Sequence, residues 1–475
     1  MKDKDEGSYA LTEKKENFSE WFHQLIKVAD IIDQRYPFQG FLVYKPYGYG
    51  ILNNCFKILE EELEKTGHGK SYFPLIIPEH LMAKEKDHIA GFHDQVFWIT
   101  HAGKSKLGEQ AALRPTSETA MYTMFSLWIR SWRDLPLKVH QSTSVFRYET
   151  KHTRPLIRDR EILWNEAHTC HASAEEAVAQ IKTGIVVYKK VFDSACIPVV
   201  FLEATDIFAG AVSATEAFTI FPDGRALEMG SVNNLGQRFS KAFDVKFRKE
   251  DGTEDFVHQT CYGISERVLG AVIAIHGDDK GLVIPPKIAP IQVVIIPIIF
   301  EKHKEKVLNK ANELCARLKK ICRVYLDASD DAVGSKFYNW EIKGVPIRIE
   351  IGPKEVDKSV VTITRRLDGE KSTISEKNIE EYVNTMLENI QNDMEKNAEN
   401  YHRDKLVETN DKDDIARAIE SRRFLKIAWC GSIDCAKTLE KSSDLSFIGY
   451  EKKPGGKCIE CSKDAAHTAY IGKTY

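Results

Sequence analysis

The chain has 475 residues, 43% of them hydrophobic, which is enough for two or three domains that each bury a core. Its 67 basic and 70 acidic residues give a net charge of −3 at pH 7, so any nucleic-acid surface must be a local basic patch. The charged start lacks the apolar core of a secretory signal, and the most apolar run, 288–300, is shorter than a membrane span of about 20 residues. We therefore expect a cytoplasmic protein without a membrane segment.

The N-terminal region predicts two helices and a strand. Apolar side chains spaced three and four apart predict a helix from Asn17 to about Gln34, and a second helix fits residues 49–67, which end in glycine. The run SYFPLIIP, 71–78, predicts a strand. Because proline lacks an N–H, Pro74 suits only an edge or interface strand, along which a partner chain could lie.

Strand-like runs dominate the next part of the chain and predict a large antiparallel sheet. These runs cover residues 93–100, 137–149, 161–169, 217–222, 225–232 and 242–247.

After a boundary near residue 285, strands alternate with helices, which is typical of a small α/β domain with a mostly parallel or mixed sheet. Residues 376–424 are charged and helical in pattern, and a cysteine-bearing tail follows. The sequence therefore predicts a multidomain protein of α+β and α/β parts, with domains at 1–285, 286–376 and 377–475.

The stretch VFRYET, 145–150, places a cation and a carboxylate two positions apart in a strand-like run. Side chains of a strand alternate between its faces, so Arg147 and Glu149 would share one side. An ordinary solvated strand face is the commoner origin of such a pattern. The surrounding motifs must therefore decide whether the pair forms a site.

The tail holds two close cysteine pairs separated by 22 residues: Cys430 with Cys435, and Cys458 with Cys461. Two such hairpins suit a tetrahedral thiolate site, since each supplies two sulfurs to one zinc ion. Disulfides or unrelated thiols are the alternative, and His467 is a possible substitute ligand. We predict a structural zinc site, because ten cysteines without a secretory signal favour reduced thiols.

Three segments carry a family resemblance: LRPTSETAMYTMF from residue 113, TRPLIRDREILWNEAHTCH from 153, and HQTCYGISERVLGAVIAI from 258. Together with VFRYET they resemble the signature motifs of class II aminoacyl-tRNA synthetases. RPTSE, RPLIRDREILWNEAHT and the four-cysteine tail are most similar to prolyl-tRNA synthetases of the archaeal and eukaryotic type. The resemblance runs from about residue 17 to 475 and implies an antiparallel catalytic sheet, an anticodon-binding α/β domain and a C-terminal zinc-binding domain.

The resemblance implies an ATP site whose chemistry rests on positioning and electrostatics rather than a nucleophilic side chain. Arg147 would contact the α-phosphate and Glu149 the adenine amino group, with Mg²⁺ as cofactor. Arg267 would bind the γ-phosphate and Arg158 the phosphate tail. Gln259 and Thr260 would lie by the ribose and adenine.

The resemblance also implies a proline pocket beside ATP. Thr116 and Glu118 would hold the secondary ammonium, and Trp164, Glu166 and His168, spaced by two, would point into one pocket from a strand. Two places depart from the family pattern: Cys261–Tyr262 where serine and an aromatic residue are expected, and Asn233–Asn234 where histidine is more usual. Size alone would not exclude cysteine from such a pocket.

These features favour a homodimeric ligase that forms prolyl-adenylate and charges proline tRNA. Arg267 follows Arg147 by 120 positions, a span that leaves no room for a large editing insertion. Glu350, Lys354, Arg365 and Arg366 could contact the anticodon or belong to a solvated turn, and the C-terminus is expected to fold back toward the active site. The alternatives are a related class II synthetase for another small amino acid, or a non-catalytic synthetase-like RNA-binding protein.

Overall fold

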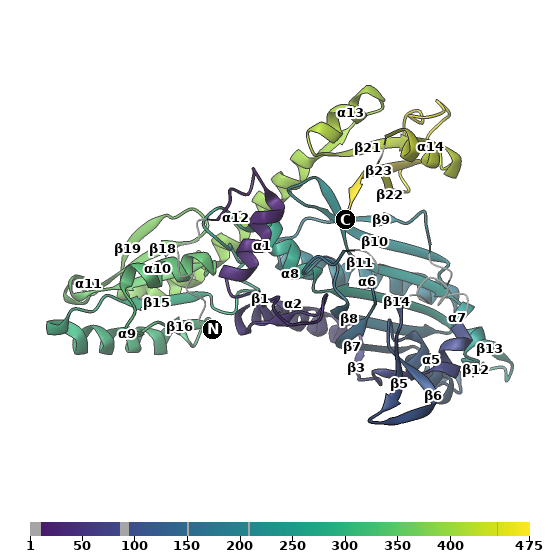
Figure 1. The fold of residues 1–475 in the computed structure, drawn as a ribbon, viewed down its shortest axis with the longest axis horizontal. Helices are drawn as coiled ribbons and strands as arrows, with labels where there is room; N and C mark the ends of the chain where they lie inside the picture. The colour runs from purple at the N-terminus through teal and green to yellow at the C-terminus, as the bar shows by residue number, and fades with distance from the viewer. Residues whose placement is uncertain (1–10, 86–94, 150–151, 208–209, 444) are drawn as a thin grey trace.

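A computed structural model describes residues 11–85, 95–149, 152–207, 210–443 and 445–475. The chain forms a large sheet region, a separate α/β lobe at the left and a small C-terminal lobe at the top (Figure 1). The first ten residues, the first two of the predicted strand 93–100, and Thr150 lie outside the described residues. Within these ranges, every helix is either too short or too polar to span a lipid bilayer.

The main sheet has eleven strands, and its central strands β10, β11, β14 and β8 are antiparallel neighbours, as predicted. In spatial order the strands are β20 (Leu406–Glu408), β21 (Phe424–Trp429), β23 (His467–Thr474), β22 (Ser446–Glu451), β9 (Val200–Glu203), β10 (Ser213–Ile220), β11 (Arg225–Gly236), β14 (His258–Ser265), β8 (Glu161–His171), β7 (Leu137–Phe146) and β3 (Gly69–Lys70).

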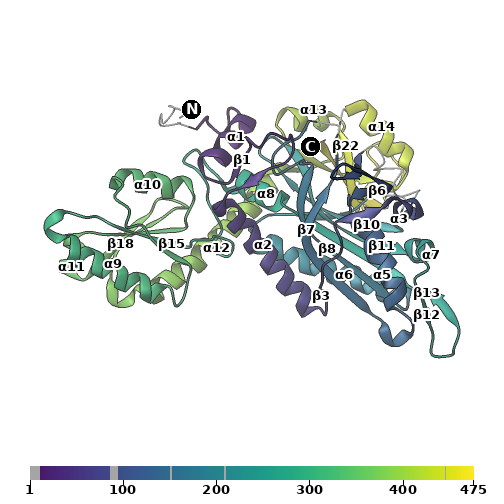
Figure 2. The same ribbon diagram turned by 60° about the horizontal axis from the view of Figure 1, so that its bottom comes forward.

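Helices cover one face of this sheet. Helices α2 (Pro46–Lys65), α6 (Ala174–Ser194) and α8 (Arg267–His276) share one apolar core with side chains such as Ala167 of β8, and Figure 2 shows α2 and α6 running along the sheet. Strand alternation sends Glu166 and His168, the neighbours of Ala167, to the opposite face. That face carries α5 (Glu118–Trp128) and the cavity described below.

Two N-terminal predictions need correction. Helix α1 covers only Phe18–Val28, because Asp30 adopts a φ of 58° and the chain turns into the short strand β1, Ile32–Asp33. Pro74 does not lie in a strand: β4 covers Ile76–Pro78 and forms the edge of a three-stranded sheet with β6 (Ser105–Leu113) and β5 (Phe97–Ala102). The strand at the sheet edge is therefore β4, which begins two residues after Pro74.

Two further strand and helix predictions were wrong in part. Residues 242–247 span the end of α7 (Arg238–Ala242) and the start of β12 (Lys246–Arg248), because Phe243 packs inward as the end of a helix rather than within a strand. The helical pattern at 376–424 breaks after α12 (Ile379–Lys405), where β20 intervenes before α13 (Asp413–Glu420).

The α/β lobe has the predicted mixed sheet. Its five strands run in the order β16 (Val324–Leu326), β15 (Val293–Pro297), β17 (Ile347–Ile351), β18 (Val360–Arg365) and β19 (Lys371–Ser375). The first three are parallel and the last two antiparallel. Helices α9 (Lys304–Leu318), α10 (Val333–Ile342) and α11 (Pro353–Lys358) complete it.

Two arginines of this lobe are engaged within the protein. Arg366 donates to both carboxylate oxygens of Asp278, at 2.9 and 2.6 Å, and so ties the lobe to the main region. Arg365 is ion-paired with Asp393 at 2.7 Å. Of the four suggested anticodon contacts, Glu350 is buried and only Lys354 is exposed.

The C-terminal lobe does not stand apart from the main sheet. Its helix α14 (Ile433–Ser443) packs beside β22, and β22 pairs with β9 while the end of β23 pairs with β11. The resemblance led us to expect that the C-terminus folds back toward the active site. The pairings that carry it there join residues far apart in the chain, and no local pattern signals them. The C-terminus is thereby carried to the middle of the main region (Figure 1).

Candidate active site

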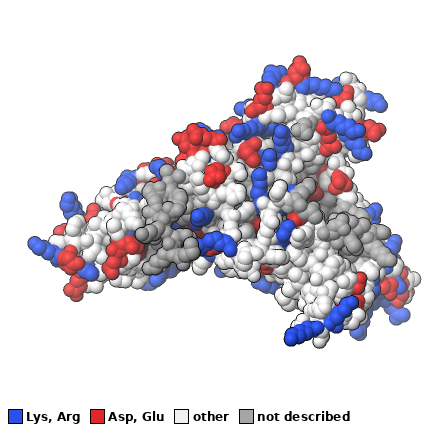
Figure 3. Space-filling model, in the orientation of Figure 1, with Lys and Arg blue, Asp and Glu red and all other residues white. Residues whose placement is uncertain are grey.

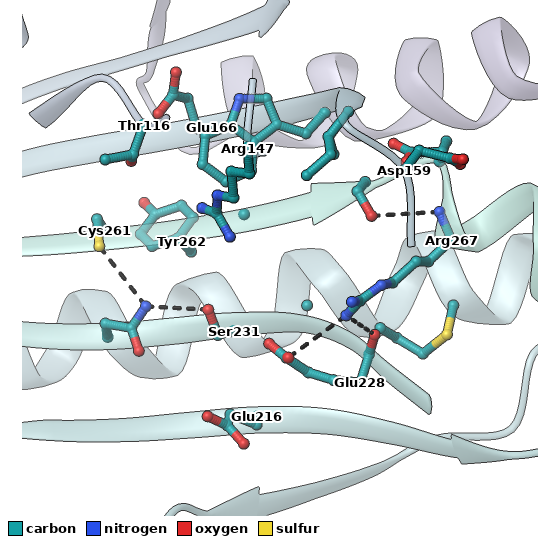
Figure 4. A pocket seen from close by; sticks show the side chains of 18 of the residues that line it. Thr116, Arg147, Asp159, Glu166, Glu216, Glu228, Ser231, Cys261, Tyr262 and Arg267 are labelled. Atoms are coloured by element: carbon teal, nitrogen blue, oxygen red, sulfur yellow. Dashed lines mark hydrogen bonds and ion pairs between the residues drawn. The ribbon is translucent and has the colours of Figure 1, made fainter. Parts of the chain in front are cut away.

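A cavity of about 290 Å³ opens on the face of the main sheet that α2 and α6 leave free. Nine of the predicted site residues line it: Thr116, Glu118, Arg147, Glu149, Arg158, Trp164, Glu166, His168 and Arg267. Four parts of the chain supply them: the start of α5 with the residues just before it, the loop between β7 and β8, strand β8 itself, and the start of α8. In Figure 4 the guanidinium groups of Arg147 and Arg267 both point into this cavity.

Arg147 and Glu149 do not lie in a strand as predicted, because β7 ends at Phe146. Both still face the same cavity. Arg147 Nε donates to the carbonyl of Pro115 at 3.0 Å, and its guanidinium lies 5.6 Å from the centre of the Trp164 ring. Burial lowers the pKa of Arg147, but a guanidinium keeps its charge in a protein, so the cavity holds a fixed cation.

Arg267 is the first residue of α8 and is held by main-chain oxygens. Its Nε donates to the carbonyl of Ile157 at 3.0 Å, and Nη1 donates to the carbonyl of Glu228 at 2.8 Å. A third cation, Arg158, donates to the main-chain oxygen of the C-terminal Tyr475 at 3.2 Å. Three guanidinium groups therefore surround one cavity, an arrangement suited to a polyphosphate.

Carboxylates and hydroxyls occupy the other end of the cavity. The Thr116 hydroxyl donates to Glu118, and Glu166 accepts from Ser117 and from His168 at 3.2 Å. Burial disfavours the imidazolium of His168, but the hydrogen bond to Glu166 and the charge of Glu118 raise its pKa. Two buried carboxylates therefore make this end selective for a cationic group.

Gln259 and Thr260 do not line the cavity. Both are fully buried in β14, where Gln259 Nε2 donates to Cys170 Sγ at 3.6 Å and the hydroxyls of Thr260 and Thr169 lie 2.5 Å apart. Cys261 does line it and accepts from Asn233 Nδ2 at 3.7 Å. Burial raises the pKa of Cys261 well above its usual value, which keeps the thiol neutral.

The sequence analysis missed four acidic residues of the cavity wall: Asp159, Glu216, Glu228 and Glu266. Glu216 and Glu228 come from the adjacent strands β10 and β11 (Figure 4). Burial, with the nearby charges of Glu228 and Asp206, raises the pKa of Glu216 to about 8. For Glu228 the sequence did offer a signal, because this carboxylate stands between two apolar residues, Leu227 and Met229, that are buried.

The four tail cysteines converge as predicted. Their sulfur atoms all lie within 4.8 Å of one another, and Cys430 Sγ is 3.7 Å from the sulfurs of both Cys435 and Cys461. Four thiolates about 2.3 Å from a zinc ion would stand about 3.8 Å apart in a tetrahedron. The sulfur positions therefore fit a Zn²⁺ ion.

Comparison with known proteins agrees with this geometry. Residues 97–276 match the class II tRNA synthetase core domain of the glycine, histidine, proline, serine and threonine enzymes, 292–386 match the anticodon binding domain, and 412–475 match the C-terminal domain of prolyl-tRNA synthetases. The proline–tRNA ligase of Pyrococcus abyssi is 45% identical over 472 residues, covering 97% of this chain and 98% of the relative. That of Methanothermobacter thermautotrophicus is 44% identical over 458 residues, covering 95% of each.

A solved structure is similar over the same length. Giardia lamblia prolyl-tRNA synthetase in complex with prolyl-adenylate superimposes with a TM-score of 0.95 at 36% identity, covering 98% of this chain and 100% of that one. The antiparallel sheet, the arginine-lined cavity and the core match define a class II aminoacyl-tRNA synthetase. Within that class, the chain belongs to the prolyl-tRNA synthetase family, the proline–tRNA ligases.

Proposed function

We propose that this chain activates proline with ATP to prolyl-adenylate and transfers the prolyl group to the 3′ end of proline tRNA. The observation that carries the proposal is the joining, in one cavity, of three guanidinium groups with the Glu118–Glu166 carboxylate end. The full-length similarity to proline–tRNA ligases supports it. A non-catalytic RNA-binding protein would have no use for this combination.

The proposed first step is an in-line attack of the proline carboxylate on the α-phosphorus of ATP, with pyrophosphate as leaving group. Arg147 would stabilise the negative charge that develops on the α-phosphate. Its guanidinium lies between the carboxylate end of the cavity and Arg267, where proline and ATP would meet (Figure 4). Glu149 would accept from the adenine amino group, and Arg158 and Arg267 would hold the outgoing phosphates. Gln259 and Thr260, buried beyond Cys261 in β14 and outside the cavity lining, receive no contact with ATP in this proposal.

Glu216 and Glu228 would hold the Mg²⁺ that accompanies ATP. Magnesium prefers carboxylate oxygens, and a divalent cation would offset both the burial and the nearby negative charge of Glu228 that raise the pKa of Glu216. When bound, the ion would neutralise charge on the phosphate oxygens.

Proline would bind at the carboxylate end. Glu118 and Thr116 would receive its secondary ammonium, while Trp164, Glu166 and His168 would form the wall around its ring. The hydrogen bonds of Glu166 to Ser117 and His168 fix that wall in place.

The substitution Glu118→Gln tests this assignment. It keeps the size of the side chain but removes the charge that would pair with the ammonium, so kcat/KM for proline should fall roughly 30- to 1000-fold, about 2–4 kcal/mol. Proline-dependent ATP–pyrophosphate exchange measures it. Glu61→Gln, on the exposed face of α2, is the control and should keep full activity. Normal exchange by Glu118→Gln would contradict the role of this carboxylate.

We further propose a division into a catalytic domain at 1–285, an anticodon-binding domain at 286–376 and a zinc-binding domain at 377–475. The four-cysteine cluster would hold a structural Zn²⁺ ion. All ten cysteines are unpaired, which supports a reducing, cytoplasmic location.

A homodimer is proposed on exposed apolar side chains near the edge strand β4. Tyr72 is 74% exposed and Ile76 50%, and the 45% exposed Trp128 packs beside Phe73 in the same region. Large apolar groups gathered at an open strand edge favour a partner surface.

The test of the proposed function is ATP–pyrophosphate exchange with each of the twenty amino acids in turn. Proline should support exchange well above the other nineteen, and charging of proline tRNA should follow. Exchange with a different small amino acid would favour the related-synthetase alternative, and no exchange at all would favour the RNA-binding one.

A further inference from the structure

A second cavity, of about 400 Å³, lies where the C-terminal lobe meets the main region. Its wall is built from the N-terminal segment 16–19, the β10–β11 turn at 223–225 and the turn at 422–423 between α13 and β21. Basic side chains dominate that wall. They are Arg154, Arg225, Arg422, Arg423 and Lys473, against the acidic Glu16 and Asp223.

Most of these cations have no carboxylate partner among the residues that the structure describes. Among ion pairs between described residues, only that of Arg225 belongs to this wall: its Nε lies 4.0 Å from Asp223 Oδ2, an oxygen that already accepts from the Tyr475 hydroxyl at 2.8 Å. Figure 3 shows Lys and Arg side chains gathered along this junction of the two lobes. Uncompensated positive charge around a concave surface attracts a polyanion.

The two turns that carry the arginines are locked against each other. Gly224 has a φ of 81°, and a Cβ placed there would meet the carbonyl oxygen of Arg422 at 2.6 Å. Arg422 itself has a φ of 55°, and the N–H of Arg423 donates to the carbonyl of Ala418 at 2.9 Å. The backbones of Arg422 and Arg423 are therefore held in place before any ligand binds.

The C-terminal residue, Tyr475, contacts arginines of both cavities. The main-chain oxygen of Tyr475 accepts from Arg158, which lines the ATP cavity. The ring of Tyr475 lies 5.1 Å from the guanidinium of Arg154 and 5.6 Å from that of Arg225, both in the second wall. A strand of phosphates lying in the second cavity would thus end beside the reacting centre.

We propose that this second cavity binds backbone phosphates of the acceptor end of the tRNA, just before the nucleotide whose ribose enters the active site. The inference rests on the proposed function, because it takes proline tRNA as the polyanion. Arginine forks hold phosphate oxygens in pairs, and such contacts position a nucleic acid without reading its sequence. Arg422 and Arg423 give the C-terminal lobe a direct part in placing the substrate.

The test is the double variant Arg422→Gln/Arg423→Gln, which keeps a Cβ at the strained position 422. Its affinity for an acceptor-stem minihelix of proline tRNA should fall roughly tenfold or more. The log–log salt dependence of that affinity should flatten by about 1.4 to 1.8 for two lost phosphate contacts. Proline-dependent ATP–pyrophosphate exchange and affinity for the anticodon stem-loop should stay unchanged. Arg422→Lys/Arg423→Lys should recover much of the loss, since it keeps the charge.

The matched control is Lys437→Gln/Lys441→Gln, which removes two exposed cations from α14 of the same lobe and should leave minihelix affinity unchanged. Lys473→Gln tests the same wall should the double variant fail to fold. Unaltered minihelix affinity in the folded variants would overturn the proposal. So would loss of inorganic pyrophosphate binding with minihelix binding kept, which would mark a site for free anions. Absence of exchange in the parent chain would instead contradict the proposed function itself.

Discussion

Replacing Arg147 with alanine should lower kcat/KM for proline-dependent ATP–pyrophosphate exchange by roughly a hundred- to a thousandfold, the usual effect of removing one preorganised donor from a developing oxyanion. The guanidinium is half-buried, donates to the carbonyl of Pro115 and lies over the ring of Trp164, so its position is set before ATP binds. No reorganisation is then needed as charge develops on the α-phosphate.

Arg147→Lys should recover little of this loss, because an ammonium cannot reproduce the planar fork that grips two oxygens. The control is Arg133→Ala, an exposed arginine that stacks on the ring of Trp132 and should keep full activity. Full recovery by lysine would show that charge alone suffices at this position. Near-normal exchange by the alanine variant would remove Arg147 from the proposed mechanism.

The substitution Cys458→Ser should abolish stoichiometric zinc in the purified protein and lower the free energy of unfolding by several kcal/mol. A structural thiolate site contributes on the order of 10 kcal/mol to folding, and Cys458 is a buried member of the cluster. Metal analysis and thermal unfolding measure the two effects. Chelation of zinc from the unaltered protein should reproduce the destabilisation.

Activity should fall with stability in that variant, because the lobe is continuous with the catalytic sheet. The end of β23 pairs with β11, and the chain then places Tyr475 against Arg158. Cys322→Ser, a half-buried thiol of the α/β lobe, is the control and should change neither zinc content nor exchange. Zinc retained at full stoichiometry after Cys458→Ser would contradict the four-thiolate assignment.

Local sequence determined much of the chemistry of this protein. The two cysteine hairpins, the alternation that sends Trp164, Glu166 and His168 to one side, and the motifs around Arg147 and Arg267 all depend on spacing within short segments. Such spacing acts through backbone geometry, which the chain carries wherever the segment lies. The class of protein itself was predicted from the resemblance of these motifs to those of class II aminoacyl-tRNA synthetases.

Only the tertiary structure decided which distant segments meet. The pairing of β22 with β9 and the approach of Arg422 to Gly224 join residues far apart in the chain. Arg147 and Glu149 likewise reach one cavity although their segment is not a strand. These contacts depend on how whole helices and strands pack, so they cannot be predicted from the composition of a short stretch of sequence.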